Sequence, residues 1–149
     1  MKNVLPNLKA VNLLTPVALT ASQSSLVLDT AGREGAGIIA QFGANTGTAF
    51  AAGTQQWAVK LQESATTNAV DFTDVAATDY ATGYGPVTVV TAGQIGVPLK
   101  FEYIGRKRYL RLVATITGTP ANVVSVAGFL GTGRHLPESA VGITGITAT

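Results

Sequence analysis

Alternating apolar and polar positions are clearest between Gly105 and Arg134. Positions 110, 112, 114 and 116 are apolar and fall on one side of a period-2 ribbon, which predicts a strand with one face in a core. The next run, Asn122–Leu130, is apolar on both sides and predicts a strand covered on both faces, by a second sheet or by another subunit. Because the turn formers Gly118, Pro120 and Asn122 lie where the two runs meet, we expect a β-hairpin with a loop of about five residues.

Shorter runs of the same kind precede this pair. They predict strands over Ser24–Asp29, Ala36–Phe42, Gln55–Ser64, Asp71–Val75, Val87–Thr91 and Leu99–Ile104. Trp57, Val59 and Leu61 alternate with polar residues, and so do Phe101 and Tyr103, so these positions are expected in the core. About eight short strands with regularly spaced turn signals and no convincing helix are typical of sandwiches and barrels. We therefore predict an all-β fold, an antiparallel β-sandwich of jelly-roll-like type.

The two ends of the chain differ from this middle part. Residues 1–23 are apolar without a clear period and contain Pro6 and Pro16. One interpretation is an extended arm, because twenty extended residues reach about 66 Å and could cross a neighbouring subunit. The other is an irregular segment folded onto its own domain. The sandwich is expected over residues 24–134, and residues 135–149 are expected to form a C-terminal tail that is ordered only when bound.

Composition limits the possible functions. Charged residues make up 12% of the chain, about half of the roughly 25% found in ordinary soluble domains. The mean hydropathy is +0.32, yet no apolar run approaches the ~20 residues that span a bilayer, and we recognise no signal peptide. We therefore expect no membrane partner, and we expect the apolar surplus in the core or in contacts with other proteins. The chain has no cysteine, which excludes disulfides and thiolate metal sites.

Residues suited to catalysis or metal binding are few. His135 is the only histidine, and the sequence contains no nucleophile-elbow motif with which it could form a catalytic triad. We therefore interpret it as a surface or interface residue. Asp71, Asp74 and Asp79 are close enough in sequence for a calcium site to be considered, but they lack the pattern of a calcium-binding loop. Trp57 is expected in the core rather than stacked on a sugar. We expect no catalytic residue, no metal and no cofactor.

The basic run 106–108 is the only cluster of positive charge in a chain with a net charge of +2. Aromatic residues for base stacking are sparse near it, which favours an acidic patch on a protein partner over nucleic acid. Tyr109 and Arg111 point away from the expected core, and both residue types are enriched at protein interfaces. The residues predicted to contact partners are Leu5, Leu8, Leu13, Leu14, Arg106, Lys107, Arg108, Tyr109, Arg111 and Arg134.

Four segments resemble a family of small structural proteins of tailed bacteriophages. They are WAVKLQES (57–64), DFTDVAATD (71–79), YIGRKRYLRLVATITGTP (103–120) and GFLGTGRHLP (128–137). The resemblance covers roughly Trp57–Pro137, and its most specific part lies at 105–120. It implies a decoration or cement protein of the phage head with a β-rich body, often trimeric, bound where capsid subunits meet. It transfers no catalytic residue.

The sequence thus leads us to expect a virion structural protein that binds the outer surface of the capsid, after assembly in the host cytoplasm, and stabilises joints between capsid subunits. Its expected partners are the major capsid protein and further copies of itself in a homotrimer. Two alternatives stay open. A tail-tube or fibre subunit is expected to form rings or rods in isolation, whereas a carbohydrate-binding β-sandwich on the virion surface is expected to expose aromatic residues on one sheet.

Overall fold

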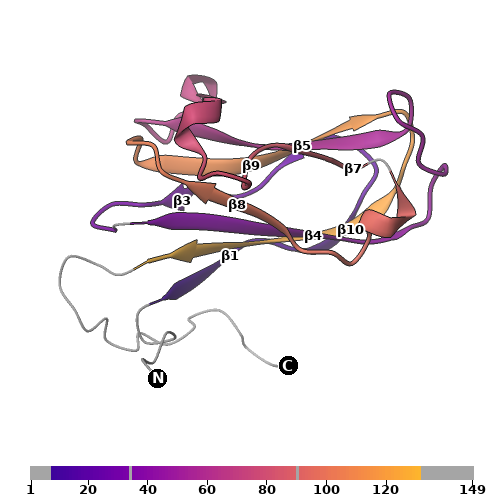
Figure 1. Cartoon of the computed structure of the whole chain (residues 1–149), viewed down its shortest axis with the longest axis horizontal. Helices are drawn as coiled ribbons and strands as arrows, with labels where there is room; N and C mark the ends of the chain where they lie inside the picture. Colours follow the sequence, from indigo (N-terminus) through magenta and orange to yellow (C-terminus); the bar gives the residue numbers. More distant parts are fainter. Residues whose placement is uncertain (1–7, 34, 90, 132–149) are drawn as a thin grey trace.

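The computed structural model describes residues 8–33, 35–89 and 91–131, and its long elements are all strands. Two antiparallel sheets lie one above the other with the core between them (Figure 1). The all-β prediction is confirmed. The strands are β1 (Lys9–Leu19), β2 (Gln23–Ser24), β3 (Leu28–Asp29), β4 (Ala36–Asn45), β5 (Gln56–Ser64), β6 (Thr73–Asp74), β7 (Val87–Val89), β8 (Leu99–Tyr103), β9 (Tyr109–Thr117) and β10 (Asn122–Leu130). Three 3-10 turns, η2 (Ala69–Asp71), η3 (Ala77–Asp79) and η4 (Ala92–Gln94), lie in the connections.

The order of the strands is that of a jelly roll. Sheet A has the order β1-β10-β4-β8, and sheet B has the order β2-β9-β5-β6, with β3 also paired to β9 and β7 to β5. If β2 with β3 and β6 with β7 are each counted as one strand position, each sheet has four positions. The chain passes from one sheet to the other at every connection between positions except the one from β5 to β6. Two packed four-stranded sheets with this exchange form the double-sheet jelly roll that the sequence predicts.

Strands β9 and β10 do not pair with each other, so the predicted β-hairpin is wrong. β9 pairs with β5 at every position from Gln56 to Ser64, whereas β10 lies between β1 and β4. The connection at 118–121 therefore crosses between the sheets. Gly118 at its start has a φ of 76°, in the left-handed region that favours glycine. The turn at this position was predicted correctly, but each of the two strands pairs with strands that are distant in sequence.

The core lies between the sheets and follows the predicted alternation. Trp57, Val59 and Leu61 of β5 are buried, as are Phe101 and Tyr103 of β8. On β10 only one face is covered by the second sheet: residues 122, 124, 126, 128 and 130 are buried, and the residues between them are half-buried or exposed. The prediction of a strand covered on both faces is therefore wrong within a single chain, and cover of its outer face by another subunit stays a prediction.

The N-terminal segment is part of the sandwich. Lys9–Leu19 forms β1, which pairs with β10 and is interrupted by two register shifts, between Asn12 and Leu14 and between Leu14 and Val17. The interpretation as an arm is corrected for these residues, because they form a strand of sheet A and Leu13 and Leu19 belong to the core. Residues 1–7 of the predicted arm and the whole predicted tail, 135–149, lie outside the described residues.

A buried amide joins the two sheets near the crossing at 118–121. The Asn122 side chain is 1% exposed. Its Oδ1 accepts a hydrogen bond of 3.0 Å from Trp57 Nε1, and its Nδ2 donates one of 2.8 Å to the carbonyl oxygen of Gly43. Asn122 thus ties β10 to both β5 and β4 and satisfies the indole N–H inside the core.

Candidate interaction surfaces

The loop between β8 and β9 carries the basic run and is held in a fixed shape. Tyr103 is buried, its hydroxyl donates a hydrogen bond to Glu63, and it accepts one of 2.8 Å from the backbone N–H of Lys107. Burial, and then the carboxylate of Glu63, raise the pKa of Tyr103. A Cβ on Gly105 would overlap the hydroxyl and ring of Tyr103. The chain therefore needs glycine at this position to turn closely around the ring.

One of the three basic side chains in this loop is paired within the chain. Arg108 makes a bidentate ion pair with Asp29, with both N–O distances at 2.8 Å. Thr30 donates two hydrogen bonds to the carbonyl oxygen of Arg108, from its N–H and its hydroxyl. The guanidinium of Arg108 holds the pKa of Asp29 at about 2. This pairing leaves Arg106 and Lys107 as the exposed cations of the run that make no ion pair within the described residues, and two such cations are few for phosphate binding.

Arg111 is also held by its own chain. Its Nε and Nη2 donate to Gln62 Oε1 at 3.0 and 2.7 Å, and its guanidinium lies 4.3 Å from the ring centroid of Phe72. Gln62 in turn donates to Asp74, which also pairs with Lys60. These residues form a polar ladder across the outer face of sheet B. The contact of Arg111 with a partner stays a prediction, but its position is explained by the fold alone.

The structure separates the other predicted interface residues. Leu13 is 1% exposed and belongs to the core, so its prediction as a contact residue is corrected: it alternates along β1 with Val11, whose partner Gly128 lies on the buried face of β10. Leu14 is half-buried and Leu8 is exposed. The β8–β9 loop and the start of β9, in sheet B, contain Arg106, Lys107, Arg108 and Tyr109. Leu5 and Arg134 lie outside the described residues.

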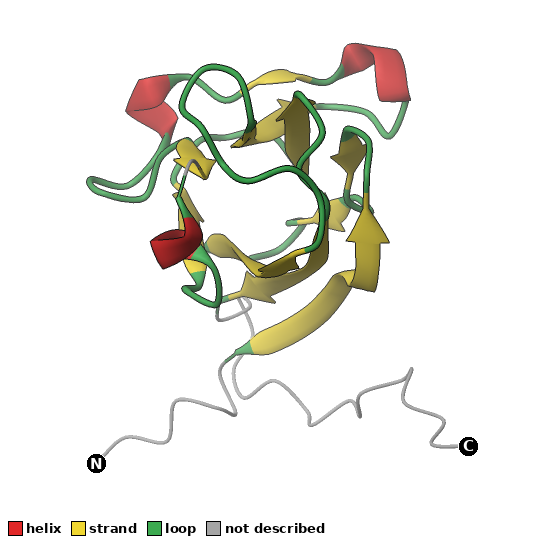
Figure 2. Cartoon of the chain, turned by 90° about the vertical axis from the view of Figure 1, so that its right-hand side faces the viewer, coloured by secondary structure: helices red, strands yellow, loops and turns green. Residues whose placement is uncertain are grey.

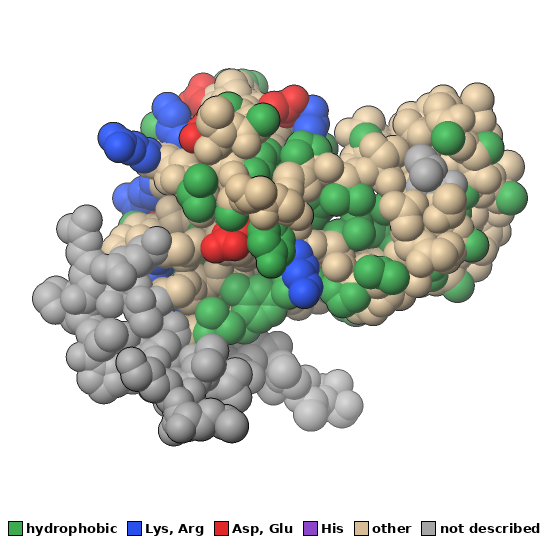
Figure 3. Space-filling model, in the orientation of Figure 1, with side chains coloured by type: hydrophobic (Ala, Val, Ile, Leu, Met, Phe, Trp, Pro, Cys, Tyr) green, Lys and Arg blue, Asp and Glu red, His purple; other side chains and the backbone are tan. Residues whose placement is uncertain are grey.

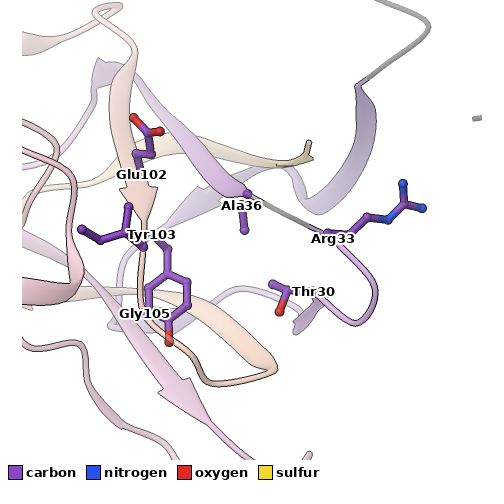
Figure 4. Close-up of a pocket in the computed structure, with 8 residues that line it drawn as sticks. Thr30, Arg33, Ala36, Glu102, Tyr103 and Gly105 are labelled. Carbon is purple, nitrogen blue, oxygen red and sulfur yellow. The ribbon is translucent and has the colours of Figure 1, made fainter. Parts of the chain in front are cut away.

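A pocket of about 220 Å³ lies beside this loop, lined by residues of the β3–β4 connection and the end of β8. Figure 4 shows that its two charged lining residues, Arg33 and Glu102, point away from it, and that the ring of Tyr103 points toward Gly105. The hydroxyl of Thr30 already donates to Arg108. The pocket therefore has no convergent polar groups of the kind that orient a small ligand.

The carboxylates considered for calcium have separate partners. Asp71 accepts a hydrogen bond from Thr66, and Asp74 pairs with Lys60 and Gln62, which lower its pKa. Among the described residues, no group of three histidine, cysteine, aspartate or glutamate side chains could hold a metal ion. Trp57 is fully buried, which confirms its predicted place in the core. Within the same ranges, no helix is long and apolar enough to cross a membrane.

One end of the sandwich carries no charged side chain among the described residues. This charge-free end consists of the loops 43–55, 91–98 and 117–121. Figure 3 shows it at the right as a surface without blue or red atoms, and Figure 2 looks onto the loops that close it. The loops bind one another: Thr46 and Thr48 donate backbone hydrogen bonds to Ala121 and Thr119, and Gly96 donates to Phe42. These hydrogen bonds hold the loops of the charge-free end together.

The outer face of sheet A is the second surface with little charge. On β1, β4 and β10 its outward side chains are all apolar, small or neutral polar, and Lys100 and Glu102 on the edge strand β8 carry its charges. Sequence reasoning missed both surfaces. The available signal was the absence of charge from 10–28, 35–59, 80–99 and 112–133, but only the fold shows that these segments meet at one end and one face.

No family model matches the chain, and no curated protein matches it. Among solved structures, the crystal structure of FLHE is similar at 16% identity, with a TM-score of 0.34, over 87% of this chain and 99% of that chain. At this level the likeness carries no argument about function.

Proposed function

We propose that this chain is a virion structural protein, a decoration or cement protein that binds the outer surface of a tailed-phage head and stabilises joints between capsid subunits. Two arguments support the proposal. The segments within 57–137 resemble such proteins, and charge is segregated in the fold. This segregation is the observation that carries the proposal, because one end and one face of the sandwich present neutral surface to a partner.

A neutral surface suits a contact that must be stable in many copies. Burying the charge-free end removes no ionised group from water, so the large desolvation cost of buried charge is avoided there. On the outer face of sheet A, only Lys100 and Glu102 on the edge strand β8 carry charge. Each ~100 Å² of apolar contact contributes on the order of 2.5 kcal/mol before the cost of association is subtracted. Symmetric copies on a shell then multiply a modest contact. The proposed partners are the major capsid protein and further copies of the chain, for which the resemblance implies a homotrimer; we propose no role in catalysis, nucleic-acid binding or membrane binding.

The experiment uses heads assembled without this protein from the major capsid protein of the same phage genome. Purified protein is mixed with these heads, and the bound amount is measured by sedimentation against the amount added. We expect saturable binding and heads that survive a higher temperature. Failure to bind, or binding without a gain in heat resistance, contradicts the proposal. Rings or rods formed by the protein alone would favour a tail-tube or fibre subunit instead.

A pair of charge variants tests whether the charge-free end makes the contact. Ala49 is exposed on this end, and Ala65 is exposed in the loop after β5. Ala49→Glu should weaken binding to heads because it buries a carboxylate in the contact, whereas the matched control Ala65→Glu should bind as the wild type does. Equal binding by both variants would assign the contact to another surface.

A further inference from the structure

Two neighbouring rows of outward residues cross sheet A. The strand register aligns them across four strands: Ala10, Phe129, Gly37 and Glu102 in the first row, and Asn12, Ala127, Ile39 and Lys100 in the second. On β4, β8 and β10 the residues between them in sequence are buried, so both rows face outward. Rows two residues apart along a strand are about 6.8 Å apart.

The two rows complement each other in size and charge. On β10 the large Phe129 stands beside the small Ala127, and on β4 the large Ile39 stands beside Gly37. The large residue is in the first row on β10 and in the second row on β4. On β8, the negative Glu102 of the first row stands beside the positive Lys100 of the second. β4, β8 and β10 therefore each offer a pair of residues opposite in size or charge.

We infer that the outer face of sheet A binds a second copy of this chain across a two-fold axis. The axis lies parallel to the face, between the two rows and perpendicular to the strands, so that the first row of each copy covers the second row of the other. Phe129 then meets Ala127 of the second copy, and Ile39 meets Gly37 of the second copy. Lys100 meets Glu102 of the second copy on both sides of the axis. A self-complementary patch is what a two-fold contact requires.

The space for this packing is present. A Cβ on Gly37 would lie 3.4 Å from the carbonyl oxygen of Phe101 and within 4 Å of no other described atom outside its own chain neighbours. Further along the same face, the side chain of Val123 on β10 is 46% exposed, so it is available for a contact with a second copy. With strands about 4.8 Å apart, three strands about 30 Å long and the five-residue β8, about 17 Å long, give a face of roughly 510 Å², or about 1,000 Å² for two copies. This area just reaches the ~1,000 Å² that a specific interface needs.

The inference goes beyond the proposed function and does not rest on it, because it concerns the isolated protein. A two-fold contact gives a dimer, whereas the homotrimer implied by the resemblance has no such axis. The mass of the protein in solution therefore distinguishes a dimer from a trimer. This measurement does not depend on whether the protein binds heads.

The experiment measures the mass of the full chain by sedimentation equilibrium over a wide concentration range. We expect a dimer. Lys100→Glu and Glu102→Lys should each weaken dimerisation roughly tenfold or more, because each turns two opposite-charge contacts into like-charge contacts. The double variant carrying both reversals should restore the wild-type affinity, which a contact with any other partner surface would not do. Both residues are exposed, so their reversal should leave the fold intact.

A second pair of variants tests the centre of the face. Ala127→Glu should give a monomer, and the matched control Thr115→Glu, on the exposed outer face of sheet B, should leave the dimer unchanged. Far-ultraviolet circular dichroism checks that each variant is folded. A wild type that is monomeric at all concentrations, or a trimer, overturns the inference. So does a double reversal that dimerises no better than the single ones, or a dimer that folded Ala127→Glu leaves intact.

Discussion

Replacing Asn122 by alanine tests the buried link between the two sheets. The substitution leaves two groups without partners: the indole N–H of Trp57 and the carbonyl of Gly43, now bonded at 3.0 and 2.8 Å. A buried polar group that loses its partner costs about 1–3 kcal/mol. With two such groups, and allowing for partial relaxation, we expect Asn122→Ala to lower the free energy of unfolding by about 2–5 kcal/mol. At this chain length that corresponds to a fall in Tm of roughly 4–20 °C.

Equilibrium unfolding in urea provides the measurement. Trp57 is the only tryptophan and is fully buried, so its fluorescence reports the opening of the core. Asn68→Ala is the matched control, because Asn68 is exposed in the loop after β5, its side chain makes no capping hydrogen bond, and its loss should change stability by less than about 0.5 kcal/mol. In a double-mutant cycle with Trp57→Phe, which removes the donor, part of the loss should disappear. A loss below about 0.5 kcal/mol for Asn122→Ala, or full additivity in the cycle, would refute the reasoning.

Two further predictions concern the loop that carries the basic run. Because Arg108 depresses the pKa of Asp29 to about 2, the pair stabilises the fold above the usual carboxyl pKa of 3.8, and this contribution is lost as the pH falls to about 2. The Tm difference between the wild type and Asp29→Asn should therefore vanish over that range, and it should be small and shrink in salt because both side chains are about half exposed; a difference that persists at pH 2 contradicts this. Gly105→Ala should lower the free energy of unfolding by about 1–3 kcal/mol, because the new methyl group overlaps Tyr103. Gly85→Ala, whose methyl group would lie 3.9 Å from Tyr80, should be close to neutral in the same urea titration.

Much of the fold could be predicted because side-chain alternation is a local property. Trp57 and Phe101 are buried where their period-2 patterns placed them, and the fold class and jelly-roll type follow from the number and spacing of the strands. Boundaries were less certain. The strand predicted over Ser24–Asp29 divides into β2 and β3. Here the backbone N–H of Leu26 turns away to donate to Leu13 of sheet A.

The candidate surfaces could be predicted only in part. The sequence located the basic run and the low charge, but it gave no sign that Arg108 pairs with Asp29, 79 residues away. Asn122 was taken as a turn former, and it is in fact a buried link between β5 and β4. Both cases depend on contacts between residues far apart in the chain, which no local pattern records.

By itself, the amino-acid sequence determined the inward faces of β5, β8 and β9 through their alternation, and how little charge the surface can carry, but it did not mark β1 as a strand. Only the tertiary structure decided which strands are neighbours: β9 joins β5, and β10 joins β1 and β4, although the sequence places β9 and β10 side by side. The physical reason is that alternation depends on the geometry of a single strand, whereas pairing is a competition among all strands for the longest matched ladder and the best-filled core. The same competition gathers the charge-free segments at one end and one face of the sandwich.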